Sequence, residues 1–281
     1  MKAIFLYVTG TGNTRRVCEA LAGAWRALGH AADCIELREH TPLPDLAAYD
    51  RIVFGYPVHA FNAPAPALKA LRCFPKADGQ KVWLLRTSGE PLSLNDAAVV
   101  TPRRLLRQKG YVLAGDLYYV MPYNIIFRHT DGMAARMWKI VLSRIGGDAK
   151  AIEAGAGTLP RVGLIKRLVS FVLRIEHPAM PWIGRHFHAA EDCIGCGACA
   201  ALCPAGNIRM ENGSPRFGKN CFGCMACAFA CPKDAVHIGI LDGWRVNGAY
   251  DPAASPATDE EVCRYCRRAY LKYFRRWETQ T

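Results

Sequence analysis

The chain reads CIGCGACAALCP at residues 193–204 and CFGCMACAFACP at residues 221–232. In each string three cysteines are separated by two residues, and a fourth follows after three more, directly before a proline. Small residues between the cysteines allow the backbone to curl tightly. Strings of this spacing hold pairs of [4Fe–4S] clusters, and the fourth cysteine of each binds the other cluster. The pattern therefore predicts two such clusters.

Crossed ligation divides the eight cysteines into two sets. The first cluster is expected on Cys193, Cys196, Cys199 and Cys231. The second is expected on Cys221, Cys224, Cys227 and Cys203. A structural zinc site is the nearest alternative, but such sites usually combine two CxxC pairs across longer gaps. Disulfides are a weaker alternative, because we expect a reducing compartment, in which they are rare.

A phosphate-binding turn is predicted near the N-terminus. Residues 2–8 form an almost continuous apolar run, which is typical of a strand buried on both faces of a parallel sheet. A turn rich in hydroxyls and glycines follows, and it precedes a helical stretch that extends to about Leu28. Backbone N–H groups in such a turn, together with the helix N-terminus, favour a phosphate. The residues of this turn are Thr9, Gly10, Thr11, Gly12, Asn13 and Thr14.

Strands and helices alternate through the first half of the sequence. Further strands are predicted at residues 31–37, 51–56, 81–87 and 111–121, and helices at about 66–74, 94–109 and 133–154. This alternation predicts an α/β fold with a doubly wound parallel sheet of five strands. Ligands of such sheets bind outside the carboxyl ends of the strands.

Two more loops are expected at that edge, and both suit a planar flavin ring. The first is aromatic and contains Pro57, Val58, His59, Ala60, Phe61 and Asn62. The second is small and polar and contains Thr87, Ser88, Gly89 and Glu90. We refer to them below as the first and second flavin loops, and to residues 9–14 as the phosphate loop.

With these loops and cysteines, residues 1–156 resemble a short-chain flavodoxin, and the whole chain resembles the flavodoxin–ferredoxin fusion proteins. The stretch Met121-Pro122-Tyr123-Asn124 also recurs in such fusions. The resemblance implies non-covalent FMN beside the two clusters, with a small α+β ferredoxin-like domain after the sheet. Many flavodoxins have a glycine in the first flavin loop. Residues 59–62 have none, and Asn62 is the residue there expected to tolerate a positive φ best.

Individual loop residues have competing interpretations. His59 either touches the flavin or is a loop histidine without a redox role. Tyr56 either stacks on the ring or packs in the core. Glu90 is expected to be a solvated acid, since a carboxylate beside the ring disfavours a reduced, anionic flavin.

Charge and composition limit the partners. The formal charge is +12, and the clusters and a flavin phosphate would lower it to about +6. The basic residues are scattered, so nucleic acid is not expected, whereas an acidic docking surface or an anionic membrane surface is. No span of the membrane and no signal peptide is predicted, and the expected location is cytoplasmic.

The segment that connects the two modules has a wide apolar face and one narrow polar stripe, formed by Lys166, Arg167, Ser170 and Arg174. Two interpretations stay open: a helix wedged between the modules, or a basic amphipathic element that rests on a membrane or a partner.

The C-terminal tail is expected to be a helix that starts with the capping box Thr258 and Glu261. Tyr265, Tyr273 and Trp277 are expected to pack against the ferredoxin module. Cys263 and Cys266 form a further CxxC pair without evident partners for a metal site.

The predicted function is electron transfer between FMN, the clusters and a redox partner such as a ferredoxin, a reductase or a downstream enzyme. The alternative is a flavin-dependent reductase of an organic substrate, with His59, Glu90 and Tyr123 as candidate proton donors. The predicted segments are 1–156 (FMN-binding), 157–186 (connector), 187–242 (two-cluster ferredoxin) and 243–281 (helical tail).

Overall fold

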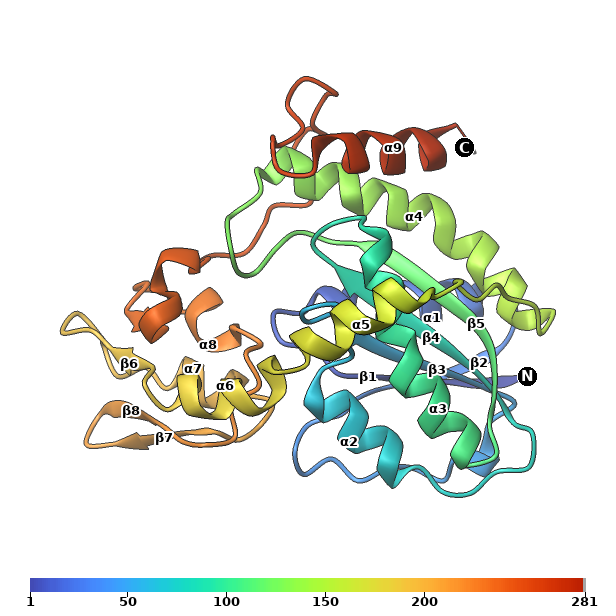
Figure 1. Ribbon diagram of the computed structural model, residues 1–281, viewed down its shortest axis with the longest axis horizontal. Coiled ribbons are helices and arrows are strands. Elements are labelled where there is room, and N and C mark those ends of the chain that lie inside the picture. The colour runs from blue at the N-terminus through green and yellow to red at the C-terminus, as the bar shows by residue number, and fades with distance from the viewer. Residues whose placement is uncertain (280–281) are drawn as a thin grey trace.

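The first half of the chain forms a five-stranded parallel sheet in the computed structural model, which describes residues 1–279 (Figure 1). The strands lie in the order β2-β1-β3-β4-β5. Their bounds are Lys2–Tyr7 (β1), Ala31–Glu36 (β2), Arg51–Pro57 (β3), Lys81–Ser88 (β4) and Val112–Val120 (β5). This is the doubly wound order in which the winding reverses at β1 and β3. The predicted fold class is confirmed, and every strand end lies within one residue of its expected place.

Helices cover both faces of the sheet (Figure 1). One face packs on α1 and α4, and the other packs on α2, η2 and α3. Their bounds are Asn13–Ala27 (α1), Ala65–Cys73 (α2), Ser93–Val99 (η2, a 3-10 helix), Val100–Gln108 (α3) and Asp131–Glu153 (α4). Alternate side chains of each central strand enter opposite cores, as in β1, where Phe5 faces α1 and Leu6 faces α2. A second short 3-10 helix, Leu46–Ala48 (η1), precedes β3.

The connector forms two helices, α5 (Leu164–Leu173) and α6 (Glu176–Gly184). Helix α5 lies on η2 and the first flavin loop, and α6 packs against the cysteine-rich part, where Met180 meets Gly223. The connector therefore does bridge the two modules. However, α5 turns three polar side chains inward, those of Lys166, Ser170 and Arg174, and leaves its apolar face uncovered, which the wedged-helix interpretation does not predict.

The cysteine-rich part contains two small antiparallel sheets and two short helices. Strand β6 pairs with β9, and β7 pairs with β8. The bounds are His188–Ala189 (β6), Ala198–Leu202 (α7), Ile208–Glu211 (β7), Ser214–Phe217 (β8), Ala226–Phe229 (α8), Val236–His237 (β9) and Gly239–Trp244 (η3, a 3-10 helix). This is the small α+β arrangement predicted for the second module.

The tail returns to the N-terminal module and ends in α9 (Arg267–Glu278), which lies along α4 (Figure 1). The expected start at Thr258 is wrong. Glu261 does accept from the N–H of Thr258, but the Arg267 guanidinium occupies carbonyls of residues 259–262 that a helix would need. The expected packing on the ferredoxin module is also wrong, because Tyr273 packs in a cluster with residues of α4.

A buried ion pair joins the two strands beneath the second flavin loop. The Arg86 guanidinium on β4 is 1% exposed and donates to both carboxylate oxygens of Asp116 on β5, at 2.6 and 2.5 Å. The same guanidinium also donates to the Asn95 carbonyl in η2. Burial of two charges is tolerated only when each has its partner, so the pair depends on both residues.

We predict that Asp116→Asn lowers the free energy of unfolding by about 3 kcal/mol, because it leaves the buried Arg86 charge with only the more distant carboxylate of Asp96, at 3.8 Å. Chemical denaturation of the protein under anaerobic conditions measures this change. The matched control is Glu211→Gln, which removes an exposed ion pair with Arg216 and should cost less than about 1 kcal/mol. Equal costs for the two variants would contradict this account of the pair.

Candidate functional site

The three predicted loops meet at the carboxyl edge of the sheet. The Thr14 and Thr87 hydroxyls are 2.9 Å apart and join the start of α1 to the end of β4. The N–H of Val58 donates to the Thr87 carbonyl at 2.8 Å, which joins the first flavin loop to the second. The structure therefore brings the phosphate loop and both flavin loops together, as the doubly wound fold requires.

The phosphate loop leaves its backbone donors available for an anion. Gly12 stands before α1 with a φ of 91°, and no side chain among residues 1–279 caps the helix N-terminus. Thr9 and Thr14 are buried within the turn and contribute hydroxyls. Uncapped N–H groups at a helix N-terminus, with hydroxyls beside them, suit the phosphate of FMN.

The first flavin loop is a tight turn. His59 and Asn62 exchange two backbone hydrogen bonds, at 2.9 and 2.7 Å, and the two residues between them, Ala60 and Phe61, have φ values of 42° and 60°. The positive φ values therefore fall on Ala60 and Phe61 and not on Asn62, because the turn places its two left-handed residues inside the 59–62 bridge. Residues with a Cβ rarely adopt a positive φ, so contacts from outside the turn must stabilise this conformation.

Helix α5 supplies that support. The Ser170 hydroxyl donates to the Asn62 side-chain oxygen at 2.7 Å, and the Asn62 amide donates to the Ser170 carbonyl at 2.8 Å. Asn62 also donates to the carbonyl of Ala60, so one buried amide fixes both the turn and its contact with the connector.

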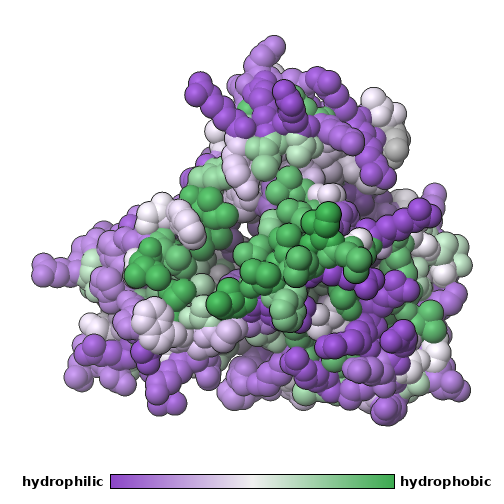
Figure 2. Space-filling model, in the orientation of Figure 1, coloured by the Kyte–Doolittle hydropathy of each residue, from purple (hydrophilic) through white to green (hydrophobic). Residues whose placement is uncertain are grey.

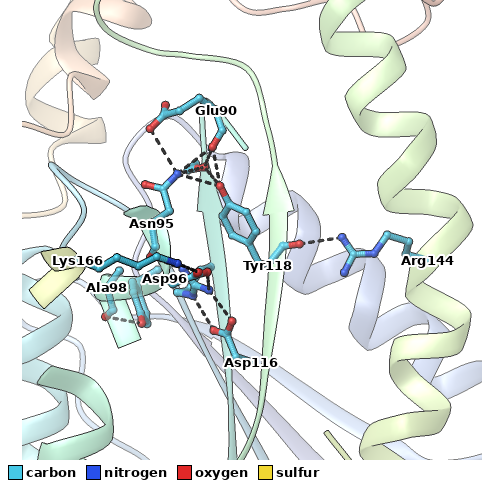
Figure 3. Close-up of polar contacts among 11 residues, drawn as sticks. Glu90, Asn95, Asp96, Ala98, Asp116, Tyr118, Arg144 and Lys166 are labelled. Atoms are coloured by element: carbon cyan, nitrogen blue, oxygen red, sulfur yellow. Dashed lines mark hydrogen bonds and ion pairs between the residues drawn. The ribbon is translucent and has the colours of Figure 1, made fainter. Parts of the chain in front are cut away.

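The second flavin loop is held by a buried polar network (Figure 3). Asn95 donates to the Glu90 carbonyl at 2.9 Å, and the Tyr118 hydroxyl donates to the same carbonyl at 2.6 Å. The Glu90 carboxyl is itself buried against the Tyr123 hydroxyl, and this burial raises the pKa of Glu90. The expectation of a solvated acid is therefore wrong. Nothing in the sequence near Glu90 indicates that residues 121–124 fold over its carboxyl group.

Tyr123 covers the second flavin loop. A Cβ added at Gly89 would lie 2.3 Å from the Tyr123 ring, so the glycine allows the ring to approach. His129 stacks on Tyr123, accepts from its N–H through Nδ1 at 3.1 Å, and meets the Tyr270 hydroxyl of α9 through Nε2. Tyr270 in turn donates to the Gly89 carbonyl. The tail thus contacts the second flavin loop directly through Tyr270, and indirectly through His129 and Tyr123.

The eight cysteines of the two strings lie around two separate cavities. One cavity is lined by Cys193, Cys196, Cys199 and Cys231. The other is lined by Cys203, Cys221, Cys224 and Cys227. Each cavity thus receives three cysteines of one string and the last cysteine of the other, as crossed ligation predicts.

These cavities fit clusters and do not fit single metal ions. No group of three His, Cys, Asp or Glu side chains within residues 1–279 converges on one point, as a zinc site requires. Backbone N–H groups of Asn207, Gly223 and Ala235 donate to cysteine sulfurs at 3.3–3.5 Å, a feature of iron–sulfur sites. Burial raises the pKa of Cys227 to about 12, and coordination by iron would deprotonate it.

The second cavity abuts the phosphate loop. A Cβ at Gly10 would lie 2.6 Å from both the Cβ and the carbonyl oxygen of Cys224. The Asn124 amide bridges the two loops, with donor distances of 3.2 Å to the Thr11 hydroxyl and 3.1 Å to the Cys224 carbonyl. A single van der Waals contact therefore separates a cysteine of this cavity from the predicted flavin pocket.

The first flavin loop reaches the same cysteine string. The His59 ring stacks on Phe222, which stands between Cys221 and Cys224, at a centroid distance of 6.3 Å. His59 Nδ1 also lies 3.4 Å from the Glu176 carboxylate of α6. Tyr56, in contrast, is fully buried in the core and donates to the Ala98 carbonyl, so the packing interpretation is the correct one for that residue.

The sequence did not predict the contacts that four residues make at this junction: Asn124, Ser170, Phe222 and Tyr270. Asn124 lies in the recurring 121–124 stretch, which was its only signal. Phe222 is one of the two spacer residues between Cys221 and Cys224, and the cysteine pattern says nothing about its contacts. Ser170 and Tyr270 belong to the connector and the tail, whose contacts depend on how these segments fold back.

The remaining cysteines lie outside the two cavities. Cys263 and Cys266 are partly buried beside the α4–α9 cluster, and the Cys263 thiol donates to the Tyr265 carbonyl. Cys18 is buried, Cys34 is partly buried and Cys73 is exposed.

Two family models match the chain. A flavodoxin domain matches residues 4–71, and a 4Fe-4S dicluster domain matches residues 192–236. The second match spans all eight cysteines that line the cavities. No curated protein matches the chain significantly.

Solved structures with similar folds include flavodoxins. A Streptococcus pneumoniae TIGR4 flavodoxin is 14% identical, with 55% of this chain and 99% of that chain covered and a TM-score of 0.42. Flavodoxin 2 from Bacillus cereus is 18% identical over the same shares, with a TM-score of 0.43. The rubredoxin oxygen:oxidoreductase of Desulfovibrio gigas is 11% identical, with 55% of this chain and 36% of that chain covered and a TM-score of 0.38.

We predict that acid destabilises the protein through His129. This ring is 3% exposed, and burial lowers its pKa to about 4, whereas an unfolded histidine titrates near 6.5. Between these values the unfolded state binds more protons, so stability is complete above about pH 6.5 and decreases by about 3 kcal/mol as the pH falls to 4.

Urea denaturation at pH 7 and pH 4.5, compared between the native protein and His129→Gln, measures this contribution. Glutamine can accept from the Tyr123 N–H but does not titrate, so the variant should lose less stability between the two pH values. Equal losses in both proteins would show that His129 does not titrate on unfolding.

Proposed function

Because the chain joins a flavodoxin domain to a 4Fe-4S dicluster domain, its cofactors are FMN and two [4Fe–4S] clusters, and we propose that it passes electrons between them and on to a redox partner protein. FMN exchanges one or two electrons, and each cluster exchanges one. The observation that carries the proposal is the contact between Gly10 of the phosphate loop and Cys224 of the second cavity.

The proposed cofactor-binding residues follow the geometry of the site. For FMN they are residues 9–14, 57–62 and 87–90. For the first cluster they are Cys193, Cys196, Cys199 and Cys231, and for the second they are Cys203, Cys221, Cys224 and Cys227. The proposed division of the chain is 1–156, 157–186, 187–242 and 243–281.

The two cysteine sets have different surroundings. Cys227 of the second set is buried, and Cys224 touches the phosphate loop, so this set lies on the inner side. Cys196 of the first set is exposed, beside the exposed Ile194. We propose that a redox partner docks at the first set, with acidic groups that complement the basic chain. The cytoplasmic location stays a prediction.

The joining of both modules in one chain supports a carrier. A tethered donor and acceptor exchange electrons at a high effective concentration, without waiting for an encounter. The connector also spans the junction. Its helix α5 hydrogen-bonds to Asn62, and its helix α6 packs against Gly223. Flavin loop and cysteine loop are thereby fixed relative to one another.

One observation favours a second function, the reduction of an organic substrate. A cleft at the junction is lined by His59, Glu176, His177 and Cys221. Glu176 Oε2 and His177 Nε2 are buried there, without a hydrogen-bond partner among the described residues. Rapid flavin reduction by NADH alone, followed by reoxidation by a small organic acceptor that His59→Gln slows, would favour a reductase over a carrier.

We predict about eight irons, about eight sulfides and one FMN per chain after anaerobic purification. Cys199→Ala should remove about four irons, retain FMN and interrupt electron delivery from a reduced ferredoxin to the flavin. Cys224→Ala should remove about four irons and also weaken FMN retention, because Cys224 packs on the phosphate loop.

The matched control is Cys73→Ala, which changes an exposed cysteine outside both cavities and should leave the iron and flavin content unchanged. Zinc in place of iron, a colourless folded protein, or unimpaired flavin reduction by ferredoxin in Cys199→Ala would each contradict the proposal.

A further inference from the structure

Helix α5 presents an uncovered apolar face. Figure 2 shows apolar residues gathered over this helix, at the centre of the face turned to the reader. Five large apolar side chains of α5 are between 59% and 83% exposed: Leu164, Ile165, Leu168, Phe171 and Val172. Ile175, the next residue of the same face, is 69% exposed. Soluble proteins rarely leave so many large apolar groups together, and such patches mark interaction sites.

The orientation of the helix is fixed by three residues of its polar stripe, which face η2, the first flavin loop and α3. Lys166 pairs with Asp96 at 2.7 Å, as Figure 3 shows. Ser170 bonds to Asn62, and Arg174 donates to the Thr101 hydroxyl at 3.1 Å. Three turns of the helix are thus anchored by polar bonds, so rotation that would bury the apolar face would break all of them.

A cluster of four arginines lies directly beside this helix. They line one groove together with Pro160 and Val162, just before α5, and Val99 and Val100 at the start of α3. None of the four makes an ion pair or a side-chain hydrogen bond with any described residue. The arginines are Arg103, Arg104, Arg107 and Arg167. Planar guanidinium groups bind phosphate in bidentate fashion, so the groove suits phosphate-bearing groups.

The shape of the apolar face distinguishes a bilayer from a protein partner. Its side chains project from a convex helix and do not line a groove, so a rigid protein would need a complementary trough, whereas a bilayer adapts to a protruding helix. At the end of α6, the exposed Trp182 and the following residue Arg185 add a tryptophan and a cation, a combination typical of membrane interfaces. No helix within residues 1–279 is long and apolar enough to cross a bilayer, so any contact would be interfacial.

We propose that the protein binds the surface of an anionic membrane, with the apolar face of α5 among the acyl chains and Arg103, Arg104, Arg107 and Arg167 at lipid phosphates. Apolar insertion and attraction to anionic lipid act together in such helices. The proposal does not depend on the direction of electron flow, and it fits the excess of basic residues in the chain.

Flotation of the full-length, cofactor-loaded protein with vesicles tests the proposal. Vesicles of phosphatidylcholine with phosphatidylglycerol should bind the protein, and binding should decrease as ionic strength rises. Pure phosphatidylcholine should bind it at least about tenfold more weakly, because the arginines then face no net negative charge. Equal binding to both vesicle types, or binding to neither, would overturn the proposal.

Two variants locate the contact. Leu168→Glu with Phe171→Glu should abolish flotation, and Arg103→Ala with Arg107→Ala should remove the preference for anionic vesicles. The control is Leu142→Glu, which adds one acidic charge at an exposed apolar position of α4 and should bind as the native protein does. All changed positions are exposed, and unchanged iron and flavin content verifies the fold.

Flotation that persists in the Leu168→Glu, Phe171→Glu protein would overturn the proposal. So would a native protein that ignores vesicles but self-associates until these substitutions are made, because the apolar face would then serve a protein contact.

Discussion

The arrangement of the molecule depends on one close contact, that between Gly10 and Cys224. The phosphate loop and the second cysteine string approach so closely that even a methyl group at residue 10 would overlap Cys224. A redox module that binds its cofactor at a sheet edge can exchange electrons with a second module only if that edge is where the modules meet. Here the carboxyl edge of the sheet, where a doubly wound fold binds its ligand, is itself the interface.

Two segments outside the cofactor loops maintain this contact. The connector holds the first flavin loop through Ser170 and Asn62, where two left-handed residues need external support. The tail returns across α4 and reaches the second flavin loop through Tyr270 and the carbonyl of Gly89. Both segments thus stabilise the junction.

Local chemistry made much of this predictable from the sequence. The strands follow from apolar runs, the phosphate loop from its glycines and hydroxyls, and the cysteine sets from their spacing. Long-range packing was not predictable. The capping box at Thr258 gave a real hydrogen bond but no helix, since Arg267 competes for the carbonyls. Glu90 is buried because Tyr123, 33 residues later, folds over it. Lys166 and Ser170 of α5 face inward because their partners, Asp96 and Asn62, lie on the N-terminal module.

The most direct measurement of the central claim is the time course of flavin absorbance after a light flash has reduced the iron–sulfur centres under anaerobic conditions. We predict a first-order transfer whose rate does not change with protein concentration. Gly10→Ala should slow it by separating the loops, while Gly23→Ala, at an open position of α1, should not. A rate that rises in proportion to protein concentration would show that electrons pass between molecules, and it would contradict the account.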